Sequence, residues 1–65
     1  MLKSTLALLY FPQSSSPRIA RQHLMRWVKN ARGLQAELAD LGYQKYQKRL
    51  STEQRKIIED YLGEP

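Results

Sequence analysis

Apolar residues recur at helical spacing in four separate stretches of the chain. The clearest stretch covers residues 17–31, where the apolar positions step by four, three, one and three residues and so share one face of a 3.6-residue period. These positions are Ala20, Leu24, Trp27, Val28 and Ala31. Shorter stripes predict helices at about residues 5–10, 34–41 and 52–62. The pattern predicts an all-α fold, a small bundle of four short helices.

Local signals mark the ends of these helices. The Ser16-Pro17 pair supplies a hydroxyl cap followed by a proline at the first helical position, where its missing N–H costs nothing. Ser51 and Gln54 have the spacing of a capping box, in which each side chain bonds the backbone of the other residue. We expect Ser4 to cap the first helix and Gly33 to end the second.

The stripes predict one shared core. Its expected members are Leu6, Leu9, Tyr10, Ala20, Leu24, Trp27, Val28, Leu38, Leu41, Tyr43, Ile57, Ile58 and Leu62. Trp27 is expected to be the central anchor, because it lies on the same stripe as Leu24. Residues 43–49 carry no helical stripe and predict an extended connector, or alternatively a small wing. Tyr43 is expected to turn inward, either alone or together with Tyr46.

The length and composition of the chain restrict its function. A chain of 65 residues holds a single domain, residues 1–65, and its 42% hydrophobic content suffices for one packed core. There is no cysteine and one histidine, His23, so neither a thiolate zinc site nor a multi-histidine metal site is expected. We expect no enzymatic activity, no cofactor and no metal, because so small a chain hardly surrounds a substrate.

No targeting or membrane-spanning segment is expected. The apolar run at residues 6–11 is shorter than a signal-peptide core, and no cleavage site follows it. An organellar transit peptide is the alternative, but its removal would leave too few residues for a core. No apolar run approaches the roughly 20 residues that span a bilayer. The sequence therefore predicts a cytoplasmic protein without membrane contact.

Positive charge is concentrated in the first half of the chain. Residues 1–36 contain six basic and no acidic residues, whereas residues 37–65 contain five basic and six acidic ones. On the second predicted helix, the face opposite the apolar stripe is nearly all cationic and offers no carboxylate at helical spacing. This face comprises Arg18, Gln22, Arg26 and Lys29, with Arg21 and Met25 at its borders.

A free cationic helix face is typical of proteins that bind polyanions. Arginine grips phosphate or guanine edges bidentately, and Gln22 has the donor and acceptor needed to read adenine. The sequence therefore favours a small DNA-binding accessory or regulatory protein with helix-turn-helix-like order, whose site is Arg18, Arg21, Gln22, Arg26 and Lys29. The alternatives are a self-associating domain, a protein-interaction module for an acidic partner, and a face that only aids solubility.

The chain also resembles a family of short uncharacterised bacterial proteins, a domain-of-unknown-function family abundant in Bacteroidetes. The resemblance runs almost end to end and rests on residues 3–12, 24–28, 41–43 and 50–54, and on the closing Tyr-Leu-Gly-Glu-Pro of residues 61–65. Leu-Gly-Glu-Pro after an Ile-rich helix is the most specific of these stretches. The resemblance implies a bacterial, cytoplasmic protein with this fold and implies no particular activity.

Overall fold

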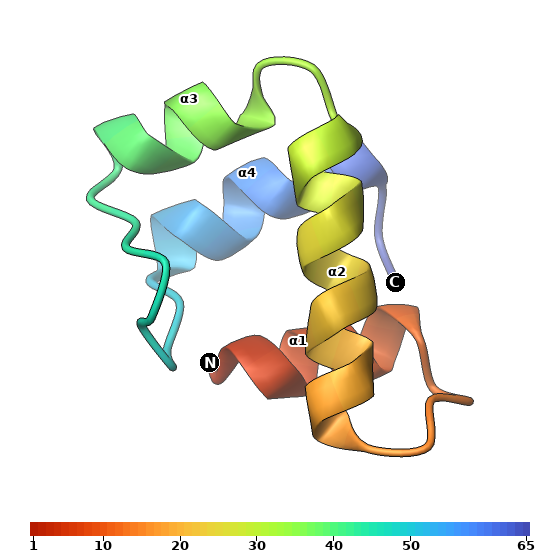
Figure 1. The fold of residues 1–65 in the computed structure, drawn as a ribbon. Coiled ribbons are helices and arrows are strands. Elements are labelled where there is room, and N and C mark those ends of the chain that lie inside the picture. Colours follow the sequence, from red (N-terminus) through yellow and green to blue (C-terminus); the bar gives the residue numbers. More distant parts are fainter.

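The computed structural model describes all residues from Met1 to Pro65 and contains four helices and no strand (Figure 1). The helices are α1 (Lys3–Tyr10), α2 (Pro17–Asn30), α3 (Leu34–Asp40) and α4 (Thr52–Leu62). The predicted all-α bundle is confirmed, and each predicted helix boundary lies within two residues of the observed one. The long connector at residues 41–51 has no helix and forms no hairpin wing, only one isolated bridge to Leu2.

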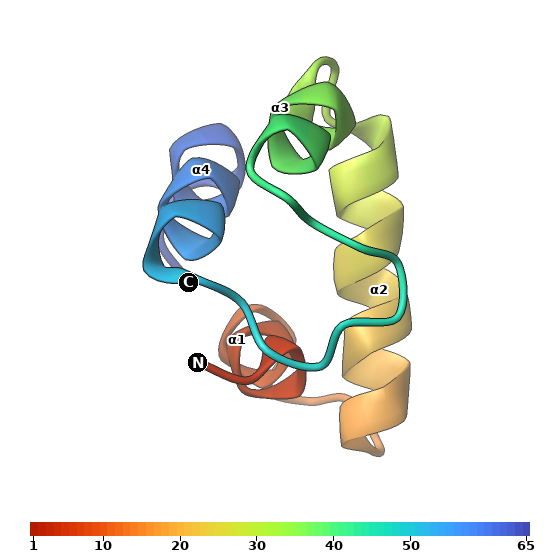
Figure 2. The same cartoon turned by 90° about the vertical axis from the view of Figure 1, so that its left-hand side faces the viewer.

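The longest helix, α2, lies at one side of the bundle. In Figure 1, α1 passes behind the N-terminal half of α2 at a steep angle, and α3 begins after a tight turn at the other end of α2. Figure 2 shows α1, α3 and α4 together on one side of α2. The opposite side of α2 is therefore covered by no other helix.

Nine apolar side chains form the buried core, namely Leu6, Ala7, Ala20, Leu24, Val28, Leu34, Leu38, Leu50 and Ile58. On α2, the buried positions repeat every four residues, so the centre of the buried stripe runs through Leu24 and Val28. Trp27 lies to one side of that line and is 46% exposed, and the prediction that it anchors the core is wrong. The hydrophobic pattern of the sequence includes Trp27 in the apolar stripe of α2, but the side of α2 that packs against the other helices is centred on Leu24 and Val28.

The predicted core differs from the observed core at other positions too. Leu9 and Leu41 were expected inside but are exposed, at 48% and 36%, because Leu9 lies off the face of α1 that meets α2 and Leu41 lies beyond the end of α3. Partly buried side chains pack around the core, among them Tyr10, Tyr43, Ile57 and Leu62. Tyr46, offered as a second inward tyrosine, is 85% exposed.

The start of α1 is held by the connector rather than by Ser4. The helix begins at Lys3 with Leu2 at the N-cap position and no side-chain cap. The Lys3 amide donates to the Lys48 carbonyl at 2.8 Å, and the Leu50 amide donates to the Met1 carbonyl at 2.7 Å. Backbone pairing with distant residues thus replaces the local hydroxyl cap, and it also draws Leu50 into the core.

Two of the predicted caps are confirmed. The Ser16 hydroxyl accepts from the Ile19 amide at 3.2 Å, with Pro17 in the first turn of α2. The capping box of Ser51 and Gln54 is complete. Gly33 does not end α2, whose C-cap is Ala31; instead Gly33 takes a positive φ of 89° in the tight turn that precedes α3.

Gln54 is a buried polar residue with more partners than its cap requires. Its carboxamide oxygen accepts from the Ser51 amide at 3.0 Å, and its amide nitrogen donates to the Leu41 carbonyl at 3.1 Å. The Gln47 side chain also donates to it at 2.7 Å. Gln54 therefore links the start of α4 to the end of α3 and to the connector.

Gln54→Ala is expected to lower the free energy of unfolding by about 2 kcal/mol, because it removes three hydrogen bonds that join the start of α4 to the end of α3 and to the connector. Ser51→Ala, which removes one capping bond, is expected to cost only about 1 kcal/mol. Urea denaturation followed by circular dichroism measures both. Gln44→Ala is the control, since the Gln44 side chain is exposed and makes no hydrogen bond. Equal stability of the Gln54 and Gln44 variants would contradict this account.

Candidate nucleic-acid interface on the second helix

Four of the five predicted site residues lie together on the outer surface of α2. They are Arg18, Gln22, Arg26 and Lys29, and all four are exposed. The helix has 14 residues and is therefore about 21 Å long. Because Arg18, Gln22 and Arg26 are four residues apart, they follow one another along nearly the same line of the helix surface. We call these four side chains the cationic face.

The cationic face has no internal partners. None of its four side chains makes a hydrogen bond or an ion pair within the protein, whose one ion pair joins Arg55 to Glu59 at 2.9 Å on α4. No acidic residue occurs in α2. The three positive charges of the face are therefore available to an external anion, as the sequence predicted.

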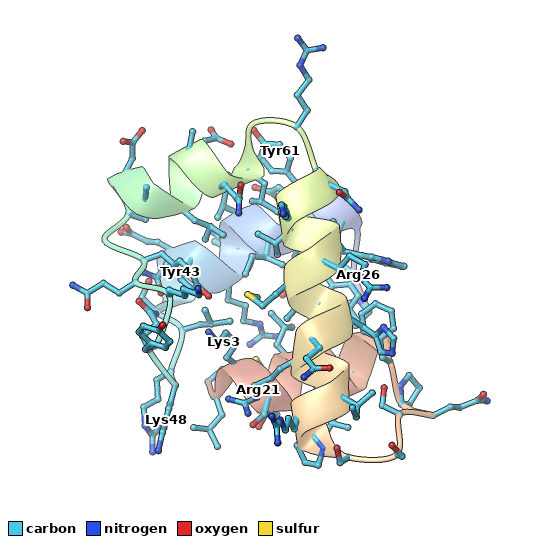
Figure 3. All side chains as sticks on the ribbon, viewed as in Figure 1. Lys3, Arg21, Arg26, Tyr43, Lys48 and Tyr61 are labelled. Carbon is cyan, nitrogen blue, oxygen red and sulfur yellow. The ribbon has the colours of Figure 1, made fainter.

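Arg21, the fifth predicted residue, is directed elsewhere. It is half-buried, and its Nε is fully buried with no hydrogen-bond partner in the protein. Figure 3 shows Arg21 and Arg26 on different sides of α2, with Arg21 toward Lys3 of α1. Its half-buried position agrees with the expectation that Arg21 lies at the border of the cationic face, because the buried stripe centred on Leu24 and Val28 places Arg21 at its edge.

Lys3 is a buried cation that the sequence reasoning missed. It is 5% exposed, and its Nζ donates to the Tyr43 hydroxyl at 2.9 Å and to the Lys45 carbonyl at 3.2 Å. The Nζ also lies 5.1 Å from the centre of the Tyr43 ring. The spacing of the sequence did indicate this burial. Lys3 precedes the buried Leu6 by three residues, so both residues lie on the same face of α1.

Lys3 and Arg21 meet in a small basic pocket between α1 and α2. The pocket has a volume of about 240 Å³ and is lined by Lys3, Arg18, Arg21, Gln22 and Met25. No carboxylate lines it. Arg18 and Gln22 therefore belong both to the cationic face and to the rim of this basic pocket.

An aromatic cluster lies on another flank of α2. The ring of Phe11 meets Trp27 edge to face, with centroids 4.7 Å apart, and lies 5.4 Å from the His23 ring. His23 is exposed, and 46% of the Trp27 surface is exposed too. A separate groove of about 640 Å³, mostly apolar, runs between α2, α3 and the connector.

Two tyrosines outside these surfaces have shifted pKa values. Burial, with help from the charges of Glu59 and Glu64, raises the pKa of Tyr10, whose hydroxyl donates to the Gly63 carbonyl. The Glu37 carboxylate raises the pKa of Tyr61 on α4. Both phenols are therefore neutral at pH 7 and supply no charge that attracts or repels a ligand.

The protein contains no group of three or more His, Cys, Asp or Glu side chains arranged to hold a metal ion. We expect its melting temperature to be the same with and without a metal chelator, because no ligand set connects metal binding to folding. Thermal denaturation followed by circular dichroism, in buffer with and without EDTA, checks this. A fall of more than a few degrees on adding EDTA would contradict the expectation.

The fold and the site define a small, basic, all-α module whose longest helix presents unpaired cations. No helix in it is both long enough and apolar enough to cross a bilayer. The chain belongs to the family described as "Domain of unknown function (DUF4248)", whose model matches residues 2–65. The resemblance to a domain-of-unknown-function family is thereby confirmed. No curated protein and no solved structure shows significant similarity to the chain.

Proposed function

We propose that this protein binds duplex DNA through the cationic face of α2, as an accessory or regulatory protein. The observation that carries the proposal is the set of three exposed cations on one side of α2, none of which has an acidic or hydrogen-bonding partner in the protein. Unpaired basic side chains gain most from phosphate, because they displace condensed counterions from the DNA.

The shape of α2 supports this proposal. An α-helix with its side chains is about 10–12 Å across, close to the roughly 12 Å width of the major groove. The other three helices all lie behind α2, so they do not obstruct the approach of its outer side to a duplex (Figure 2). In this arrangement Gln22 faces the base edges, while Arg18, Arg26 and Lys29 contact phosphates.

The order of the helices supports a helix-turn-helix-like mode of binding, with α2 as the recognition helix and α1 bracing it from behind. The connection between them, Phe11 to Ser16, has six residues and is longer than the turn of three or four residues in the standard motif. This longer connection includes Phe11, whose ring supports Trp27 and His23 on α2.

Titration of the protein with duplex DNA at two salt concentrations tests the proposal. We expect saturable binding at about 50 mM salt that weakens steeply as salt is raised. Absence of measurable duplex binding at the lower salt concentration would reject the proposal.

A second candidate function is a protein-interaction module that docks onto an acidic partner. It is favoured by the exposure of Trp27, since tryptophan and arginine are enriched where interfaces concentrate their binding energy. Trp27 and Arg26 are neighbours on α2, so one partner surface with an apolar pocket and a carboxylate fits both. Under this candidate, Trp27→Ala weakens partner binding while duplex DNA binding is absent from the start.

A further inference from the structure

Two positively charged side chains, one buried and one half-buried, lie at the basic pocket without any negative charge to balance them. Lys3 is almost fully buried, and both acceptors of its Nζ are neutral groups. Arg21 buries its Nε with no acceptor at all. Burying the charge of Lys3 without a carboxylate is costly, and the second cation on the same pocket adds repulsion to that cost.

The donors around the basic pocket are not used up. An ammonium group has three N–H donors, of which Lys3 uses two. The covered Nε–H of Arg21 is only one of its five guanidinium donors, and the other four, on the terminal nitrogens, make no hydrogen bond in the protein. Arg18 and Gln22, which also line the pocket, make no side-chain hydrogen bond in the protein. The pocket therefore combines excess positive charge with spare donors from both α1 and α2.

We propose that the basic pocket is a binding site for a phosphate group. A phosphate offers several acceptor oxygens and one to two negative charges, which match the spare donors and the unbalanced cations. Arginine suits it in particular, because its planar fork pairs with two phosphate oxygens at once. Met25 is the one apolar side chain among the lining residues.

This site differs from the cationic face in geometry and in what it requires. The cationic face lies on one helix and binds by counterion release, whereas the pocket takes its lining from two helices and includes a buried amine. A free phosphate ion is enough to occupy the pocket, so the inference does not depend on the protein binding duplex DNA. Each proposal can be wrong while the other holds.

Nuclear magnetic resonance of the ¹⁵N-labelled full chain, titrated with inorganic phosphate, tests the site. Sodium chloride is lowered in parallel to keep the ionic strength constant, so that general screening does not change. We expect saturable shifts of the Arg21 Nε–H signal and of the Lys3 and Gln22 backbone amides. Shifts that are absent, or that rise linearly without saturation, would overturn the proposal.

Arg21→Gln is expected to weaken phosphate binding about tenfold or more, as expected for the loss of a charge-assisted hydrogen bond. The matched control is Arg26→Gln, which removes the same charge from the same helix but lies outside the pocket. It should change the affinity less than about twofold, the scale of a screened surface charge. Equal weakening by the two variants would mean diffuse attraction and would overturn the site.

Arg18→Gln is a second pocket variant, which tests the site even if Arg21→Gln does not fold. It is expected to remain folded, because Arg18 is exposed and has no partner in the protein. It too should weaken phosphate binding more than Arg26→Gln does. If Arg18→Gln behaves like Arg26→Gln and Arg21→Gln is unfolded, the proposal is rejected.

The source of the phosphate is distinguished by competition with two forms of one dinucleotide, with and without a 5′-phosphate. Equal competition by both forms identifies the internal diester of a nucleic acid as the ligand. Competition by the phosphorylated form alone identifies a terminal monoester, and competition by neither identifies the free ion. All three results uphold a phosphate pocket, and only the first connects it to a nucleic-acid backbone.

Discussion

Leu24→Ala is expected to lower the free energy of unfolding by about 3–5 kcal/mol, whereas Trp27→Ala is expected to lower it by only about 1–2 kcal/mol. Leu24 is 0% exposed and lies at the centre of the stripe that α2 buries against α1, α3 and α4. Removing its branched end leaves a cavity in a core of nine side chains. Trp27 is larger, but nearly half of its surface is already in water.

The effect of Leu24→Ala is large relative to the reserve of the domain. Chains near this length are stabilised by only a few kcal/mol, since they bury a smaller fraction of their surface on folding than larger domains do. The loss expected for Leu24→Ala is about as large as the whole free energy of unfolding of the domain. We therefore expect the Leu24 variant to be largely unfolded at about 37 °C and the Trp27 variant to remain folded.

Chemical denaturation followed by circular dichroism compares the two variants. Leu9→Ala is the matched control, because it removes the same atoms as Leu24→Ala from a leucine that is 48% exposed. We expect it to cost less than about 1.5 kcal/mol. If Trp27→Ala proved as damaging as Leu24→Ala, Trp27 would be a core anchor and the observed packing around α2 would be wrong.

Replacing both Arg18 and Arg26 by alanine is expected to remove most of the salt dependence of duplex DNA binding. The cationic face carries three exposed cations, and each phosphate contact contributes about 0.9 to the slope of log affinity against log salt concentration. The natural sequence should therefore show a slope near −2.7, and the double variant a slope of about −0.9. Affinity at low salt should fall along with the slope.

The control for this prediction is the pair Lys45→Ala and Lys48→Ala, which removes the same charge from the connector. Both lysines are exposed and lie away from the outer side of α2 (Figure 3 labels Lys48). An equal loss of affinity and slope in the connector pair would reduce the binding to nonspecific attraction by a protein of net charge +5. The helix-turn-helix-like mode would then be wrong.

Gln22→Ala tests base reading within the same experiment. Gln22 carries no charge, so its loss should leave the salt slope nearly unchanged. If its amide reads a base edge, the variant instead loses preference among duplexes of different sequence. A parallel change in affinity for every duplex, with no change in preference, would assign Gln22 to backbone contact alone.

Local signals in the sequence were sufficient to predict where the four helices lie. Caps and helical periodicity depend on residues within one or two turns, so Ser16 with Pro17 and Ser51 with Gln54 marked two helix starts correctly. The exposed positions of Arg18, Gln22, Arg26 and Lys29 followed from the same periodicity, because they lie opposite any reasonable placement of the apolar stripe.

Long-range packing decided what lies at the edge of each stripe. Hydrophobicity does not tell which side of a broad stripe meets a neighbouring helix, so Trp27 is predicted inside but is 46% exposed. The direction of Arg21, whose Nε is covered at the edge of the same stripe, is likewise decided by packing. The role of Lys3 depends on Tyr43 and Lys45, which lie 40 and 42 residues further along the chain. The start of α1 likewise depends on residues 48–50.

The sequence by itself determined four helices, their principal caps and a cationic outer face on α2. Only the tertiary structure brought Lys3 and Arg21 into one pocket, because their side chains come from different helices and meet where α1 packs against α2. Helix periodicity describes one element at a time, whereas a site between two elements depends on the angle and register at which they pack.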